Sequence, residues 1–535
     1  MNAGTAFGLR RRIIIWTLLA YAIVALCLGN SASAQGVVPT DNGPVRGVDT
    51  ADVHEYLGIP YAAPPVGDLR WRPPQPHARW QTPRDASHFG NHCPQPASPF
   101  GTASETEDCL YLNVFTPNEG PGRGHTKNLP VMVWIHGGGL VVGESDDYDP
   151  TRLVEQGVVV VTFNYRLGLL GFLAHPALSA ESGNGSGNYG LMDQQAALRW
   201  VQRNIAKFGG DPDNVTIFGQ SAGGLSVHAQ LASPLAAGLF DRAIAQSGAY
   251  ALSLPSLASA ESRGKSFADT VGCFDQTAAC LRSQRVGIVV ANTPTTEGSL
   301  LPNLDGNVLP RSIKAAFESG QFNRVPVTEG STHDEFSIFY KTEIEDHFGV
   351  LPPFFYPFVV PIFLQTVGLH ANPADVMALY PLSAYQNNVG LAVTALATDA
   401  LFSCPGRRAA QTLSQFVPTF AYEFNDPNVP QIFVPPAASF PSYGSYHASE
   451  LLSLFDSPQR GGHAPFTPDE EKLADAMIHY WTQFGRAGNP NSPATPFWPA
   501  YTVANDTYQS LEPPTPKPTT GFAADHKCAF WDAHQ

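Results

Sequence analysis

The sequence has few charged residues, and acidic residues outnumber basic ones. Only 14% of its 535 residues are Asp, Glu, Lys or Arg, and 46 acidic against 31 basic residues give a formal charge of −15. No basic run comparable to residues 10–12 occurs elsewhere in the chain. Because nucleic-acid binding depends on clustered Lys and Arg that contact phosphates, we expect no nucleic-acid partner.

Internal repeats and low-complexity linkers are also absent. The most apolar segment beyond the N-terminus, residues 348–364, contains four prolines, so we expect a buried or pocket-lining loop rather than a membrane span. Hydrophobic residues make up 43% of the chain, which allows a large core and argues against disorder. Length alone fits about two to four domains, but without linkers we expect residues 35–535 to form a single domain.

The N-terminus has the layout of a secretory signal peptide. Three arginines at residues 10–12 precede an apolar stretch at 13–28, and the small residues Ala32-Ser33-Ala34 follow. A membrane anchor is the alternative, but the stretch is short for a span, which needs about 20 residues. We therefore predict that residues 1–34 are removed and that the protein is secreted or periplasmic, without a stable membrane span. Removal takes away three Arg and no acidic residue, which changes the formal charge to −18.

Seven cysteines are present, and one of them, Cys27, lies in the predicted signal peptide. An even number in an exported protein indicates disulfides, so the remaining six predict three bridges. Six cysteines allow 15 pairings, and their spacing alone does not choose among them. The six are Cys93, Cys109, Cys273, Cys280, Cys404 and Cys528.

Strand and helix patterns alternate through the middle of the chain. Short apolar runs indicate strands over residues 131–136, 158–163, 214–219, 241–246 and 325–328. Apolar residues at helical spacing indicate helices over residues 191–208, 221–231 and 468–485. This alternation predicts an α/β fold with a large, mostly parallel, twisted central sheet flanked by helices.

A G-x-S-x-G motif at Gly219–Gly223 lies between a predicted strand and a predicted helix. This is the context of a nucleophile elbow, in which a tight turn exposes the serine above the sheet. The motif alone is weak, but its placement favours Ser221 as a nucleophile. The glycine run after His136 follows another strand, and its backbone N–H groups are candidates for an oxyanion hole. An ordinary turn is the alternative for this run.

Several longer motifs resemble those of one enzyme family. They are EDCLYLN (107–113), NYGLMDQ (188–194) and FGGDPDNVTIFGQSAGG (208–224). In this order they are similar to the signatures of type-B carboxylesterases, which include cholinesterases and lipases and have the α/β-hydrolase fold. The resemblance runs from Gly43–Gly47 to Cys528–Trp531, nearly the whole predicted mature chain.

The resemblance implies the partners of Ser221, which in this fold follow it in the order acid, then histidine. Residues 330–335 (GSTHDE) resemble the segment with the acid, and the match falls on Glu335. Glu329 and Asp334 are the competing carboxylates.

Residues 446–451 (YHASEL) resemble the segment with the base, which makes His447 the candidate. His463 and His479 are the late alternatives. A serine nucleophile needs such a base and an orienting carboxylate.

The resemblance further implies structural roles for other residues. The implied oxyanion donors are the N–H groups of Gly138, Gly139 and Ala222. The implied disulfides are Cys93–Cys109, Cys273–Cys280 and Cys404–Cys528. The implied buried ion pairs are Arg70–Glu107 and Arg166–Asp193. We expect no cofactor and no metal, since no H-E-x-x-H motif is present and the late histidines lack metal-ligand spacing.

Two departures from cholinesterases bear on the substrate. Residues 94–108 contain no Trp to hold a choline cation by cation–π contact, and Gln220 stands where cholinesterases have Glu. We therefore expect the substrates to be neutral, hydrophobic small-molecule esters, with residues 352–363 and 432–446 as candidate segments lining the pocket.

A triacylglycerol lipase of the same family is the near alternative function. A non-catalytic binding module is the distant one, because such relatives usually lack the nucleophile. The sequence predicts no oligomeric state.

Overall fold

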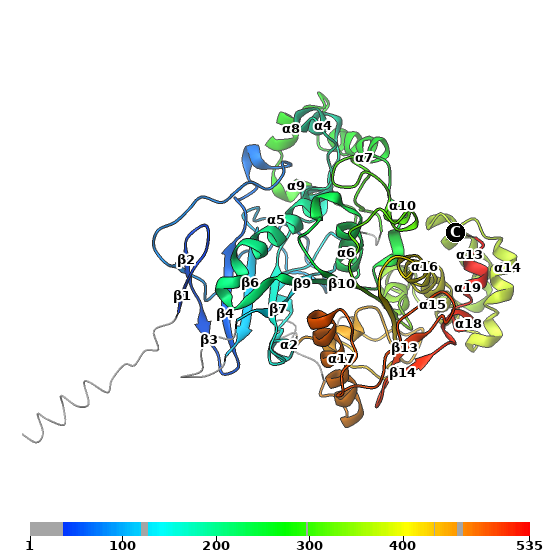
Figure 1. The fold of residues 1–535 in the computed structure, drawn as a ribbon. Coiled ribbons are helices and arrows are strands. Elements are labelled where there is room, and N and C mark those ends of the chain that lie inside the picture. Colours follow the sequence, from blue (N-terminus) through cyan, green and yellow to red (C-terminus); the bar gives the residue numbers. More distant parts are fainter. Residues whose placement is uncertain (1–35, 119–126, 296–297, 433, 457–463, 535) are drawn as a thin grey trace, which may run out of the picture.

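The computed structural model describes residues 36–534 except 119–126, 296–297, 433 and 457–463. The predicted signal peptide and His463 lie outside the described residues. An 11-stranded sheet extends through the protein (Figure 1). Its strands in spatial order are β14 (Lys517–Thr519), β13 (Tyr508–Leu511), β12 (Thr419–Phe424), β11 (Val327–Thr332), β10 (Arg242–Gln246), β9 (Gly210–Gln220), β7 (Leu129–Ile135), β8 (Val159–Phe163), β6 (Tyr111–Pro117), β4 (Val53–Pro60) and β3 (Val48–Asp49).

The middle of this sheet is parallel and its two edges are antiparallel. Strands β8, β7, β9, β10, β11, β12 and β13 pair in parallel. Strands β3, β4 and β6 extend one edge and β14 the other, all in antiparallel pairs. The central parallel strands β7 and β8 have nearly continuous apolar runs, as is typical of strands buried on both faces. A separate three-stranded sheet is formed by β1 (Val37–Pro39), β2 (Pro44–Arg46) and β5 (Arg84–Asp85).

The side chains of β7 show how the two layers of helices are held. Val131, Val133 and Ile135 belong to one hydrophobic core cluster, together with residues of α5 (Tyr189–Asn204) and α6 (Ala222–Ala232). Met132 and Trp134 belong to a second cluster, together with residues of α17 (Pro468–Ala487). Alternate residues of a strand point to opposite faces. The sheet therefore packs between α5 and α6 on one side and α17 on the other (Figure 1).

The sequence predicted these central elements with small shifts in their bounds. The strand expected at 325–328 is β11 and extends to Thr332. The helix expected at 468–485 is α17, which begins with a capping box between Thr467 and Glu470 and ends before Gly488. Such a box satisfies N–H groups that lack a partner in the first helical turn.

The expectation of a loop at residues 348–364 was wrong. The segment forms a short 3-10 turn, η7 (Pro353–Phe355), followed by the helix α13 (Tyr356–Thr366). Prolines are tolerated in the first turn of a helix, where their missing N–H would lack a partner in any case. Pro361 is the one proline beyond the first turn of α13. Because proline has no N–H, the helix loses one backbone hydrogen bond there.

A continuous helical stretch, Val389–Leu413, has the length and hydropathy of a membrane span. It consists of α15 (Val389–Thr398), the π-helical turn η9 (Asp399–Ser403) and α16 (Cys404–Leu413). The most apolar part of this stretch is 78% buried inside the protein, as expected of a core helix.

The structure contains the three disulfides that the resemblance implies. The Cα atoms are 4.9 Å apart in Cys93–Cys109, 5.6 Å in Cys273–Cys280 and 5.2 Å in Cys404–Cys528. It also contains the two implied ion pairs. Arg70 Nε lies 2.6 Å from Glu107 Oε1, and Arg166 Nε lies 2.7 Å from the buried Asp193 Oδ2.

Candidate active site

Ser221 lies in the turn between β9 and α6. Its backbone has φ +58° and ψ −123°, a region that residues other than glycine rarely adopt. The turn is held by the Ser221 N–H, which donates to Gln246 O at 2.8 Å, and by close contact with β7. A Cβ added to Gly223 would lie 1.9 Å from Ile135 O, so only glycine fits there. The strained turn is the geometry that presents a nucleophilic oxygen above a sheet.

The glycine run after β7 lies beside this turn. A Cβ added to Gly137 would approach the Ser221 Cβ to 3.2 Å. Gly138 and Gly139 have φ of +96° and +63°, and their N–H groups have no hydrogen-bond acceptor among the described residues. Ala222 is the first residue of α6, and an N–H at this position has no partner within the helix. The three implied donors therefore come from segments that meet at Ser221.

Glu335 and His447 are brought together by pairing of their neighbours. The Asp334 N–H donates to Ser445 O at 2.9 Å, and the Ser445 N–H donates to Asp334 Oδ2 at 3.0 Å. This fixes the chain after β11 against the segment that leads to His447. In consequence Glu335 Oε2 contacts His447 Nδ1, while Glu335 Oε1 accepts the Thr332 N–H at 2.9 Å.

The site is almost closed to solvent. Ser221 is 5% exposed, His447 is 4% exposed and Glu335 is fully buried. An ion pair or hydrogen bond in such surroundings is less screened than at the surface. The Glu335 carboxylate is thus positioned to fix the imidazole with its proton on Nδ1, which leaves Nε2 as the basic nitrogen.

The competing residues are occupied elsewhere. Glu329, on β11, lies 2.7 Å from Nε2 of the buried His228 on α6. Burial raises the pKa of Glu329, and the nearby His228 acts in the opposite direction. Asp334 is engaged with Ser445, as described. His479 lies within α17, and no contact of its ring with Ser221 is found among the described residues.

Sequence reasoning singled out Gln220 but did not predict which residues surround His447. The Gln220 Nε2 lies 3.2 Å from His447 Nε2. The rings of Phe339 and Phe402 lie 4.9 and 5.3 Å from the imidazole, between ring centres. Neither phenylalanine is in the two segments proposed as pocket lining. No local signal marks them, because Phe339 and Phe402 reach His447 only through the packing of helices distant in sequence.

Glu450, three residues after His447, is a further buried carboxyl group near the site. Its Oε1 accepts from Gln246 Nε2 at 3.1 Å, and Gln246 also receives a hydrogen bond from Trp481 Nε1 at 3.0 Å. Burial, followed by the charge of Glu335, raises the pKa of Glu450 to about 7. The carboxyl group therefore titrates near neutrality, beside the proposed base.

Two groups of side chains within the described residues have donor atoms close enough to hold a metal ion. They are His333–Glu423–His526 and His92–Glu144–Asp146. In the first group both nitrogens of His526 lie 2.6 Å from carboxylate oxygens, of Asp399 and Glu423. This is hydrogen-bonding distance and fits a protonated imidazole between two carboxylates. In the second group Glu144 already accepts hydrogen bonds from Thr102 and Gln95.

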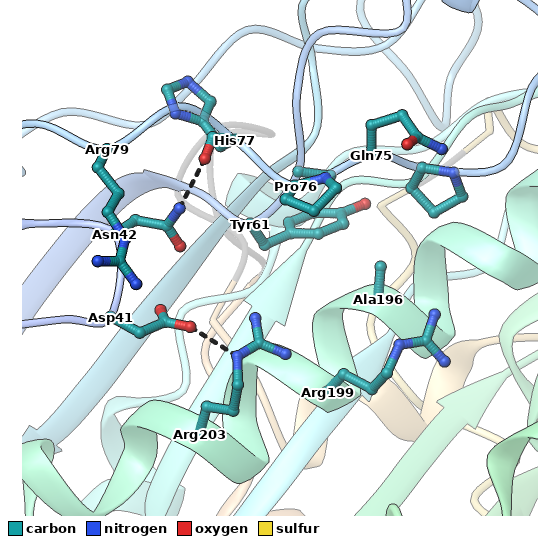
Figure 2. Close-up of a pocket in the computed structure, with 12 residues that line it drawn as sticks. Asp41, Asn42, Tyr61, Gln75, Pro76, His77, Arg79, Ala196, Arg199 and Arg203 are labelled. Carbon is teal, nitrogen blue, oxygen red and sulfur yellow. Dashed lines mark hydrogen bonds and ion pairs between the residues drawn. The ribbon is translucent and has the colours of Figure 1, made fainter.

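A surface cavity of about 340 Å³ lies next to the N-terminal strands and α5 (Figure 2). Arg79, Arg199 and Arg203 contribute to its lining, and Arg203 pairs with Asp41 at 2.6 Å. None of Ser221, Glu335 and His447 lines it, so it is separate from the candidate active site.

Comparison with known proteins identifies the family. The profile of the Carboxylesterase family matches residues 34–531. The chain is 35% identical to a fumonisin B1 esterase of Sphingopyxis macrogoltabida, over 91% of this chain and 88% of that protein. It is 35% identical to the para-nitrobenzyl esterase of Bacillus subtilis (strain 168), with 87% and 92% covered, and 34% identical to a human cocaine esterase, with 91% and 88% covered.

Solved structures show the same likeness. A para-nitrobenzyl esterase structure superimposes with a TM-score of 0.76 at 32% identity, covering 92% of this chain and 99% of the other. The matches in sequence and in fold extend over nearly the whole chain. This protein therefore belongs to the carboxylesterase family and is a carboxylic ester hydrolase with the α/β-hydrolase fold.

Proposed function

We propose that this protein is an exported serine carboxylesterase that hydrolyses neutral, hydrophobic esters through Ser221, His447 and Glu335. The observation that carries the proposal is the buried contact of Glu335 with His447 next to a serine in a strained strand-to-helix turn. Each residue has the chemistry that its place requires: a nucleophile, a base and a carboxylate that orients the base.

The reaction follows from this arrangement. His447 Nε2 removes the proton of Ser221 as the serine oxygen attacks the ester carbonyl, and Glu335 stabilises the imidazolium that forms. The oxyanion of the tetrahedral intermediate is stabilised by the N–H groups of Gly138, Gly139 and Ala222. The imidazolium returns its proton to the departing alcohol, and water then hydrolyses the acyl-enzyme by the same steps.

The surroundings of the base favour an uncharged substrate. Phe339 and Phe402 pack on the imidazole, and the neighbour of the nucleophile is the neutral Gln220. Residues 94–108 contain no Trp for a cation, while a formal charge of −18 on the mature chain repels anions. The relatives are named for unlike esters, among them fumonisin B1 and cocaine, so their names do not select one ester.

The test of the mechanism is a set of three variants assayed on a soluble nitrophenyl ester. Ser221→Ala is expected to abolish turnover. Glu335→Gln is expected to lower kcat by a factor on the order of 10³–10⁴, as for other triads with a disrupted acid. Glu329→Gln is the matched control, because Glu329 contacts His228 and not His447. Wild-type turnover in Ser221→Ala, or equal losses in the two Glu variants, would refute the assignment.

Two further measurements test the finer parts of the proposal. Turnover on a series of acyl chain lengths, dissolved and emulsified, separates a carboxylesterase from a triacylglycerol lipase. Intact mass of the protein recovered outside the cytoplasm is expected to correspond to a chain that begins at Gln35. A chain that retains residues 1–34 would contradict cleavage of the signal peptide.

A further inference from the structure

The cavity in Figure 2 is positively charged although the protein is acidic. Arg79, Arg199 and Arg203 contribute to its lining, and Asp41 is the one acidic residue among the described residues that line it. These four side chains leave a formal charge of +2, whereas the whole chain carries −15. We call this site the arginine cavity. A local charge opposite in sign to that of the whole protein attracts anions to this one place on the surface.

Two of the three guanidinium groups have no partner within the part of the chain that the structure describes. Arg203 Nε lies 2.6 Å from Asp41 Oδ2, but Arg79 and Arg199 make no ion pair or hydrogen bond with a described residue. A guanidinium group carries five N–H donors and stays protonated in proteins. The arginine cavity therefore offers two free, permanently charged groups of donors to a ligand.

Arg199 and Arg203 lie four residues apart on α5, which places them on the same side of the helix. Like charges at this spacing repel each other and destabilise the helix. Burial lowers the pKa of Arg199, and the positive charge of Arg203 lowers it further. An anion bound beside the two guanidinium groups would replace this repulsion by attraction.

Asp41 does not supply that anion, because both of its carboxylate oxygens are already engaged. Oδ2 pairs with Arg203, as described, and Oδ1 accepts a hydrogen bond from Asn204 Nδ2 at 2.8 Å. Burial acts to raise the pKa of Asp41, but the hydrogen bonds from Arg203 and Asn204 outweigh it and lower the pKa. Asp41 thus neutralises Arg203 and leaves Arg79 and Arg199 for a second anion.

Much of the remaining lining of the arginine cavity is apolar. Five of its residues contribute mainly carbon atoms: Tyr61, Ala62, Pro74, Pro76 and Ala196. The Tyr61 hydroxyl already donates to Asn164 O at 2.6 Å, so it is not available to a ligand. The volume of about 340 Å³ is within the range of small-molecule sites. The lining therefore suits an anion that has an apolar body.

We propose that the arginine cavity binds a small organic carboxylate, with its charge on the guanidinium groups and its apolar body against Tyr61 and Pro76. The planar fork of a guanidinium group matches the two oxygens of a carboxylate. Inorganic phosphate also binds arginine, but it has no apolar part that would remove the carbon atoms of the lining from water. The site is additional to the proposed function, because none of Ser221, Glu335 and His447 lines it.

The binding experiment is isothermal titration calorimetry with benzoate in phosphate-free buffer at constant ionic strength. The mature protein is first inactivated with an organophosphate, so that benzoate does not occupy the active site. In Arg79→Gln/Arg199→Gln the Kd is expected to rise at least about tenfold, since a hydrogen bond to a charged group contributes about 1.5–3 kcal/mol. The matched control is Arg263→Gln/Arg285→Gln, which removes the same charge from two exposed arginines outside the cavity.

Three outcomes would overturn the proposal. They are no saturable binding of benzoate to the parent protein, an equal rise of the Kd in the cavity variant and in the control variant, and tighter binding of inorganic phosphate than of benzoate. The cavity variant without organophosphate is expected to keep turnover of a dissolved nitrophenyl ester within about twofold of wild type, because the catalytic residues do not line the cavity. A large loss of turnover would refute the separation of the two sites.

Discussion

His526 is predicted to make folding stability fall steeply at alkaline pH. The imidazole is 3% exposed and lies between Asp399 and Glu423, with each ring nitrogen 2.6 Å from a carboxylate oxygen. Burial alone would lower the pKa of His526, but the hydrogen bonds to the two carboxylates outweigh it and raise the pKa from 6.5 to about 10. The positively charged form is therefore the one that the folded state stabilises.

The size of the effect follows from the difference in pKa between the folded and unfolded states. A pKa of about 10 against 6.5 corresponds to about 5 kcal/mol, since one pKa unit is worth about 1.4 kcal/mol. Because the folded-state pKa is raised, this stabilisation is fully present below pH 6.5 and is lost as the pH rises through 10. By the same relation the contribution is about 3 kcal/mol at pH 8 and about 1 kcal/mol at pH 9.

The assay is urea unfolding followed by tryptophan fluorescence at pH 6, 8 and 9, for wild type and His526→Gln. The glutamine side chain would keep a hydrogen bond but carry no charge, so the two curves are expected to differ most at pH 6 and to converge as the pH rises. His370→Gln is the control, because His370 is exposed. A difference between wild type and His526→Gln that stays constant from pH 6 to pH 9 would refute the reasoning.

Two other predictions concern buried charges. Arg166→Met is expected to destabilise the protein by about 3–5 kcal/mol, because it leaves the fully buried Asp193 without its partner. In urea unfolding, the double variant Arg166→Met/Asp193→Leu should recover most of this lost stability. A double variant as unstable as the single one would contradict the pairing argument. Burial raises the pKa of Glu450 from 4.5 to about 7, so its neutral form stabilises the folded state below pH 4.5 and that contribution, about 3 kcal/mol, is lost as the pH rises to 7. In Glu450→Gln the midpoint of urea unfolding should vary less with pH between pH 5 and 8 than it does in the wild type. An unchanged pH dependence of the midpoint would show that Glu450 is ionised throughout this range.

The central strands could be read from the sequence because burial on both faces leaves a strong local mark. The runs at 131–136, 158–163 and 214–219 are β7, β8 and β9 with small shifts. The antiparallel edge strands β4 and β14 were not predicted, since their pairing partners set their conformation more than their own residues do. The loop expected at 348–364 is a helix, because its prolines fall where a helix tolerates most of them.

The sequence by itself determined the nucleophile turn, because a strand, two glycines, a serine and a helix are contiguous and their geometry is local. It also determined, by resemblance, the family and the candidates Glu335 and His447. Only the tertiary structure decided which carboxylate meets the histidine. Glu329 is only six residues from Glu335. The pairing of Asp334 with Ser445 nevertheless brings Glu335 to His447, whereas Glu329 contacts His228 on α6. The same holds for His526, whose two carboxylate partners come from distant segments that only packing brings together.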